Sequence, residues 1–240
     1  KEVYLNYTYE TASTLGLGEH FKKTANTIVK NFNPKKNGLV VDIGSNDGIL
    51  LKYFQEFGMK VLGVDPMPGI AEKATKNGIP TISNFFTESF SKEMRNKYGS
   101  ASIISSNNLV ADTDDLDEFV KGVKNLMDKD SIFFFETFYF YLQVKNFVWD
   151  FTYHEHYSYF LVQPLKKYFE NKGFEIINIE PNLTKGGSMR CVLKLKGGKY
   201  PVNESVKNHI DEEIKSGFYN GDFIKEYWIF FNFFKKIIKV

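Results

Sequence analysis

VVDIGSNDGILL, at residues 40–51, predicts a buried strand that ends at Gly44 and a helix that begins after Gly48. Glycine lets the backbone fold back sharply between the two and lets a ligand approach closely. A dinucleotide-binding turn would carry G-x-G-x-x-G, so that a pyrophosphate rests on the helix N-terminus. Here the middle glycine is missing and Asp47 would repel a pyrophosphate. The acidic turn therefore suits a ligand with a cationic amino-acid end.

The alternation of apolar runs and helical patterns continues from Leu39 onward and indicates βαβ units around a parallel sheet. Strands are expected at residues 39–44, 60–66, 79–83, 100–108, 131–137, 175–181 and 189–197. The last two meet at a Gly-Gly turn and form a hairpin that closes the sheet edge. This predicts an α/β, Rossmann-like fold with a seven-stranded, mostly parallel sheet and an antiparallel last strand. Residues 4–32 are expected to form a loop and then one or two helices lying over the strand ends.

The composition limits the kinds of partner. A net charge of +2 over 240 residues, without a long basic run, argues against nucleic acid. The single cysteine, Cys191, excludes an internal disulfide and a cysteine-rich zinc site, and it fits a reducing, cytoplasmic compartment. The apolar run at residues 227–234 is too short to span a bilayer, so no membrane is expected, and it offers a surface for a homodimer. The expected regions are a helical entry segment (1–36), the main domain (37–200) and a helical tail (201–240).

Polar residues also follow the other parallel strands at the points where these strands end. Asp65, about twenty residues after the turn, is placed to accept hydrogen bonds from both hydroxyls of a ribose. The acidic turn, this aspartate and the seven-stranded sheet together indicate a site for S-adenosylmethionine (SAM). Asn84 with Phe85 or Phe86 would flank the adenine. The predicted cofactor-binding residues are Asp42, Gly44, Ser45, Asn46, Asp47, Gly48, Asp65, Pro66, Asn84, Phe85, Phe86, Asn107 and Asn108. The alternative is that the glycines serve helix packing and the phenylalanines belong to the core.

Several segments occur together in the order and spacing of one known family. They are VVDIGSNDGILL, GVDP, GIPTISNFF, SNNLVADTDDLDEFVKGV, DFTYHEHYSYF and GGSMR. From about Tyr4 to Lys196 the chain resembles the SAM-dependent sugar C-methyltransferases, which have the class I SAM-dependent methyltransferase fold and act on nucleotide-linked keto-deoxysugars. The resemblance implies that a base removes the proton next to the sugar ketone. The enolate so formed takes the methyl group and leaves S-adenosyl-L-homocysteine (SAH).

The resemblance also implies roles for single residues. Tyr153, Glu155 and His156 would line the substrate, with His156 as the base, and Tyr9 would contact cofactor or substrate. Histidine suits this role because its unperturbed pKa of about 6.5 lies near neutrality. On a flat strand Tyr153 and Glu155 would face away from His156, so we expect the segment to turn. Where the family usually has a histidine after the fourth strand, this chain has Asp112.

Two modules of the family are missing from this chain, namely the cysteine-ligated zinc module and the second, C-terminal half. We expect either a piece of a longer protein or a shortened member that uses another acceptor. The alternative functions are an O- or N-methyltransferase on a small acceptor, with His156 deprotonating a hydroxyl, and a non-catalytic SAM-binding module. A metal site at His154 to His156 is a further alternative, but the sequence suggests no third ligand.

Three other polar residues are interpreted singly. His20 and His209 are interpreted as structural or surface residues. Arg190, three residues after the Gly-Gly turn, is a candidate contact for a phosphate or carboxylate.

Overall fold

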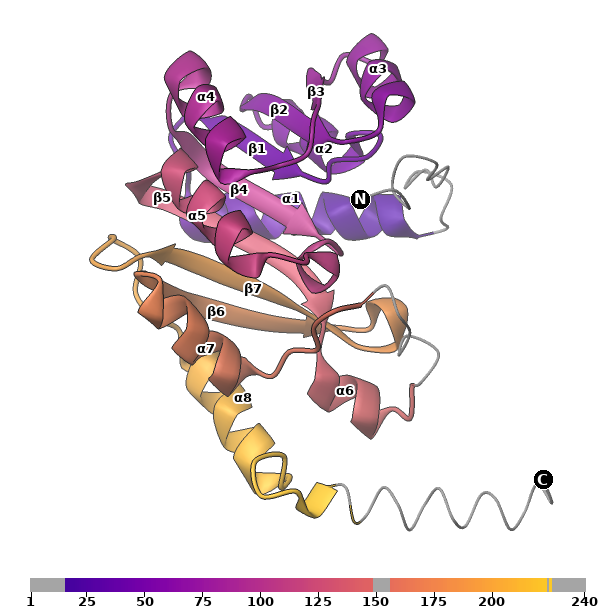
Figure 1. Ribbon diagram of the computed structural model, residues 1–240, viewed down its shortest axis with the longest axis vertical. Helices are drawn as coiled ribbons and strands as arrows, with labels where there is room; N and C mark the ends of the chain where they lie inside the picture. The colour runs from indigo at the N-terminus through magenta and orange to yellow at the C-terminus, as the bar shows by residue number, and fades with distance from the viewer. Residues whose placement is uncertain (1–15, 149–155, 224, 226–240) are drawn as a thin grey trace, which may run out of the picture.

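The computed structural model describes residues 16–148, 156–223 and 225 of the chain. Seven strands form one sheet in the order β3-β2-β1-β4-β5-β7-β6 (Figure 1). Strands β1 to β5 are parallel, and β7 is antiparallel to both of its neighbours, β5 and β6. The strands are β1 Leu39–Ile43, β2 Lys60–Asp65, β3 Thr81–Ser83, β4 Ala101–Asn107, β5 Met127–Phe138, β6 Phe174–Asn182 and β7 Ser188–Leu195. The predicted fold class is confirmed.

Helices cover both faces of this sheet. The helices are α1 Leu17–Phe32, α2 Ile49–Glu56, α3 Pro68–Lys76, α4 Glu88–Tyr98, α5 Leu116–Leu126, α6 Phe140–Lys145, α7 Val162–Asn171 and α8 Glu204–Lys215, with short 3-10 turns η3 Val110–Asp112 and η4 Thr184–Gly186. One core lies between the sheet and α1 with α2, and it includes Phe21 and Phe54. The other lies under α4, α5 and α7, and it includes Phe119 and Phe169. In Figure 1, α4 and α5 lie in front of the sheet and α1 behind it.

Strand β1 is buried from both sides, which explains its continuous apolar run. Val40 packs in the core under α1 and α2, whereas Val41 and Ile43 pack in the core under α4 and α5. The turn that follows ends at Gly48, which has a φ of +78°. A Cβ at this position would lie 2.8 Å from a methyl carbon of Ile79. Gly48 thus lies where the start of α2 approaches Ile79 closely.

The expected hairpin is formed by β6 and β7, with β6 at the edge of the sheet and β7 between β6 and β5. Its turn is η4, and side chains close to α6 hold this turn in place. Gln143 Nε2 donates hydrogen bonds to the carbonyls of Lys185 (3.1 Å) and Gly187 (2.8 Å). A Cβ on Gly187 would lie 2.6 Å from Cβ of Leu142, so the close approach of turn and helix requires glycine there.

Helix α1 differs from the expectation that it would lie over the strand ends. It packs along one face of the sheet through Phe21, Ala25 and Ile28, and only its first turn reaches the carboxyl ends of the strands. The expected region boundaries remain predictions. No helix in the described part of the chain is long and apolar enough to cross a membrane.

Candidate active site

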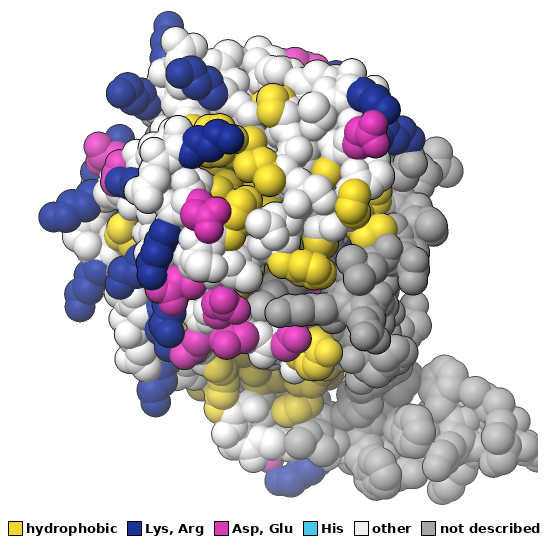
Figure 2. Space-filling model, turned by 45° about the horizontal axis from the view of Figure 1, so that its top comes forward, with side chains coloured by type: hydrophobic (Ala, Val, Ile, Leu, Met, Phe, Trp, Pro, Cys, Tyr) yellow, Lys and Arg dark blue, Asp and Glu magenta, His cyan; other side chains and the backbone are white. Residues whose placement is uncertain are grey.

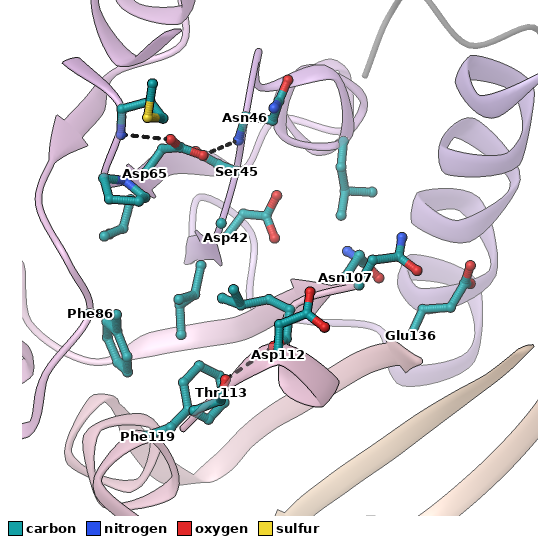
Figure 3. Close-up of a pocket in the computed structure, with 18 of the residues that line it drawn as sticks. Asp42, Ser45, Asn46, Asp65, Phe86, Asn107, Asp112, Thr113, Phe119 and Glu136 are labelled. Carbon is teal, nitrogen blue, oxygen red and sulfur yellow. Dashed lines mark hydrogen bonds between the residues drawn. The ribbon is translucent and has the colours of Figure 1, made fainter. Parts of the chain in front are cut away.

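A cavity of about 940 Å³ lies at the carboxyl ends of β1, β2, β4 and β5 (Figure 3). The structure brings most of the predicted cofactor-binding residues together with the predicted base. The predicted residues on its wall are Asp42, Gly44, Ser45, Asn46, Asp65, Pro66, Asn84, Phe85, Phe86, Asn107, Asn108 and His156. These residues come from successive strand ends, which parallel βα units bring to one edge of the sheet.

Two of the predicted cofactor residues, Asp47 and Gly48, are not among the residues that line the cavity. Asp47 instead accepts a hydrogen bond from the Ile49 N–H through Oδ1 (3.3 Å), at the start of α2. The predictions for Tyr9, Tyr153 and Glu155 lie outside the described residues. So do the expected turn of the segment before His156, the possible metal site and the apolar tail.

Asp65, at the end of β2, organises the turn after β1. Its Oδ2 accepts a hydrogen bond from the Asn46 N–H (2.9 Å), and its Oδ1 accepts one from the Met67 N–H (3.0 Å), as Figure 3 shows. Burial raises the pKa of this carboxyl, while the two backbone hydrogen bonds act against the rise. A carboxylate offers about four acceptor positions, so both oxygens retain capacity for further donors.

Asp42, at the end of β1, is almost fully buried and accepts a hydrogen bond from the Ser105 hydroxyl (2.7 Å). Burial raises the pKa of Asp42 to about 7, the Ser105 hydrogen bond opposes the rise, and the charge of Asp65 adds to it. A cation near Asp42 would favour its ionised form. This end of the cavity therefore suits a ligand with a positively charged group.

Several buried polar atoms on the wall lack a hydrogen-bond partner among the residues that the structure describes. They include Ser45 Oγ, Asn107 Oδ1, Asn108 Oδ1 and Asn182 Nδ2. Leaving a buried polar atom unpaired costs about 1–3 kcal/mol, so a polar ligand that supplies hydrogen-bond partners here is favoured. The residues present thus fit a nucleoside that carries an amino-acid end.

An aromatic pair forms the wall near Asn84. The rings of Phe86 and Phe119 meet edge to face, with centroids 5.6 Å apart. Gly122 on α5 makes room for this arrangement, because a Cβ there would lie 2.7 Å from the Phe86 ring. Such a wall suits a flat, apolar ring system.

The charges on the wall are mostly negative. The acidic lining residues are Asp42, Asp65, Asp112, Asp114, Asp115, Glu118 and Glu136. Among the described residues of the lining, Lys185 is the only lysine or arginine. Figure 2 shows hydrophobic side chains gathered at the centre of one face of the molecule, with a group of acidic side chains next to them.

His156 lies on the cavity wall and is only 8% exposed. The chain after it is tied to η3, since the Tyr157 N–H donates to the Ala111 carbonyl (2.9 Å). Nε2 of His156 lies 3.6 Å from Oδ1 of Asp112, and its ring centroid is 4.2 Å from that of Phe138. Asp112 thus places a carboxylate beside the predicted base.

Glu136, near the end of β5, is a cavity residue that the sequence reasoning missed. It is 1% exposed, and both its oxygens accept from Nε2 of His20 (2.9 and 2.8 Å). The Thr184 hydroxyl donates to Oε1 (3.0 Å), and the Arg190 guanidinium lies 3.4 Å from Oε2. Burial alone would raise the pKa of Glu136, but His20, Arg190 and Thr184 hold it below its ordinary value. A charged residue at the end of the apolar run 132–135 was the available signal.

The structure shows what the His20 and Arg190 side chains contact. His20 is structural in that it pairs with Glu136, yet it also lines the cavity. Arg190 is 3% exposed, contacts the carboxylates of Glu136 and Glu180, and is absent from the cavity lining. The carboxylates that Arg190 contacts are therefore the protein's own. His209 pairs with Glu212 on α8, away from the cavity.

The chain belongs to the methyltransferase domain family, whose profile matches residues 18–179. The C-methyltransferase NovU of Streptomyces niveus is 29% identical over 212 residues, which cover 88% of this chain and 50% of that protein. The chain thus spans about half the length of this curated relative.

Solved structures share the fold at low sequence identity. Magnesium protoporphyrin IX methyltransferase from Synechocystis PCC 6803, with bound SAH, has a TM-score of 0.59 at 13% identity, covering 81% of this chain and 92% of that one. A SAM-dependent methyltransferase from Archaeoglobus fulgidus has a TM-score of 0.60 at 15% identity, covering 74% and 94%.

Proposed function

We propose that the chain transfers a methyl group from SAM to the carbon next to a ketone in a nucleotide-linked deoxysugar, with His156 as the general base. The observation that carries the proposal is the position of His156. It lies beside Asp112 on the wall of a cavity whose other residues fit a nucleoside with an amino-acid end. The similarity to a C-methyltransferase supports carbon as the methylated atom.

Different strand ends contact different parts of the cofactor in this proposal. Asp65 accepts hydrogen bonds from the ribose hydroxyls, and Asp42 lies where the cationic amino-acid end would rest. Asn84, Phe85 and Phe86 flank the adenine. When bound, SAM supplies an electrophilic methyl group.

The acceptor lies toward β5, where His156, Glu136 and Lys185 line the cavity. His156 takes the proton from the carbon next to the ketone, and the electron pair of the C–H bond moves onto the carbonyl oxygen. Positioning of the resulting carbon nucleophile in line with the methyl group supplies most of the remaining rate enhancement. The buried wall around His156 excludes water that would return the proton.

Asp65→Ala is expected to weaken SAM binding by about 100-fold, because hydrogen bonds to a charged group contribute about 1.5–3 kcal/mol each. Isothermal titration with SAM and with SAH measures the change. The matched control is Asp130→Asn, which alters an exposed carboxylate at the opposite end of the sheet. Equal SAM affinity in Asp65→Ala and the native chain would contradict the assigned ribose contact.

The proposed reaction predicts solvent exchange before methyl transfer. In deuterium oxide without SAM, a nucleotide-linked keto-deoxysugar is expected to gain deuterium at the carbon next to the ketone in the presence of the chain. With SAM added, mass spectrometry is expected to show one added methyl group on that carbon. Transfer to oxygen or nitrogen without exchange would establish the alternative, an O- or N-methyltransferase. Tight SAM binding without exchange or transfer would indicate a non-catalytic SAM-binding module.

A further inference from the structure

Lys185 is the basic residue that remains unexplained on the cavity wall. It occupies the middle of η4 with a left-handed φ of +50°, which non-glycine residues adopt rarely. The turn is fixed on both sides, by Thr184 through its hydroxyl on Glu136 and by Gln143 through the Lys185 carbonyl. Residues held in such a conformation are often found at ligand-binding sites, so we considered what the Lys185 side chain contacts.

The Lys185 side chain lies close to the predicted base. Its Nζ is 5.3 Å from the centroid of the Phe138 ring, and the His156 ring is 4.2 Å from the same centroid. Lys185 and His156 both line the cavity, as does Asp112, whose charge acts on both of them. Within residues 16–148 and 156–223, no carboxylate lies within ion-pair distance of the Lys185 ammonium.

Although Lys185 as a residue is partly open to solvent, its ammonium lies over the Phe138 ring on the cavity wall. Burial lowers the pKa of Lys185, and the charges of Asp112 and Glu136 only partly offset that effect. In a lining that is otherwise acidic, it is the one ammonium available to an anionic group of the ligand, within the described residues. A charge in a partly desolvated site interacts more strongly with a developing charge than it would in water.

We propose that the Lys185 ammonium binds the carbonyl oxygen of the acceptor and stabilises the negative charge that develops there when His156 removes the neighbouring proton. This inference rests on the proposed function and adds a second catalytic residue to it. The C–H bond breaks, its proton goes to His156, and its electron pair moves onto the carbonyl oxygen. The ammonium donates a hydrogen bond to that oxygen and keeps its own proton. The acceptor ketone would thus lie between the two groups that contact the Phe138 ring.

The test compares Lys185→Met and Lys185→Arg with the native chain in the exchange assay without SAM. Removing one donor to an oxyanion costs about 10²–10³-fold in kcat, so Lys185→Met is expected to lose that much exchange with little change in KM. Lys185→Arg keeps the charge and is expected to retain part of the rate. The matched control is Lys52→Met on α2, an exposed lysine outside the cavity lining, which is expected to exchange at the native rate.

Two outcomes would overturn the inference. Native exchange by Lys185→Met would show that the oxygen is stabilised elsewhere, and a raised KM with unchanged kcat would assign Lys185 to a phosphate of the acceptor instead. In either case the exchange by the native chain keeps the proposed function intact. Absence of exchange in the native chain would contradict the proposed function itself.

A measurement without turnover tests the placement of Lys185 separately. Trace acetylation near neutral pH, read by mass spectrometry, is expected to modify Lys185 more than Lys52. Only the neutral amine reacts, and the lowered pKa of Lys185 increases its neutral fraction. A nucleotide-linked keto-deoxysugar is expected to protect Lys185 alone. Equal modification of both lysines with no protection would overturn the inference. The pH profile of exchange adds a check. Lys185→Arg is expected to move the alkaline limb of the profile to higher pH, because a guanidinium keeps its proton there. The other titratable groups near this position, Asp112, Glu136, His20 and His156, are the same in both chains.

Discussion

The His156→Ala variant is expected to bind SAM as tightly as the native chain and to lose methyl transfer by about 10²–10⁴-fold, the usual contribution of a general base. The imidazole lies beside Asp112 on the cavity wall, whereas Asp65 and Asp42 lie at the ends of β2 and β1. Isothermal titration with SAM and single-turnover transfer measure the two properties independently. Native turnover in this variant would eliminate His156 as the base.

The buried position of His156 makes controls necessary. Its ring packs against Phe138, so His156→Gln, which fills more of the space, separates loss of packing from loss of the base. Both His156→Ala and His156→Gln are expected to transfer methyl groups at a similarly low rate, far below that of the native chain. His209→Ala, which removes a histidine of α8 outside the cavity lining, is expected to leave transfer unchanged.

Glu136→Ala is expected to lower the free energy of unfolding by about 3–5 kcal/mol. It removes the buried acceptor of His20 and Thr184. It also leaves the buried Arg190 guanidinium with Glu180 as its remaining carboxylate among the described residues. Urea denaturation followed by circular dichroism measures the change. Glu180→Ala is the matched control, since Glu180 pairs with the same arginine but its side chain is 39% exposed. Its expected cost is at most about 1 kcal/mol. Similar losses in the two variants would contradict a special role of the buried carboxylate.

The ionisation of Glu136 also makes the free energy of unfolding depend on pH. The pKa of Glu136 in the folded chain lies below its ordinary value of 4.5, so the carboxylate's stabilising contribution is present above that value. The contribution is lost as the pH falls through the folded-state pKa. Glu136→Gln removes this ionisation, so its unfolding free energy is expected to fall less steeply than that of the native chain below about pH 4.5.

The parts of the fold that the sequence predicted are those encoded locally. Buried parallel strands read as continuous apolar runs, and a turn such as Gly44 to Gly48 interrupts them visibly. Since parallel strands place their carboxyl ends at one edge, the sequence alone assigns Asp42 and Asp65 to one site. Even the position of Asn107 and Asn108 follows from the end of a strand.

The missed residues depend on contacts between distant parts of the chain. Glu136 pairs with His20, 116 positions away in the sequence, and no periodicity reports such a pairing. Lys185 sits next to an expected Gly-Gly turn, where polar residues are ordinary, so nothing local distinguished it. Arg190 was a candidate contact for a ligand phosphate or carboxylate, and the sequence pattern does not show that Glu136 of β5 and Glu180 of β6 pair with it. The sequence pattern thus predicted where the helices and strands lie but contained no information on long-range ion pairs.

The way β7 is inserted between β5 and β6 separates the two tasks of the cavity along the chain. In the proposed function, residues 42 to 108 supply the cofactor side of the cavity, and η4 with the segment after residue 155 supplies the acceptor side. The η4 turn is held by Gln143 of α6 and by Glu136 of β5. We therefore expect acceptor preference to change with residues 182 and 183, which line the cavity, while the methyl-donor pocket keeps its sequence.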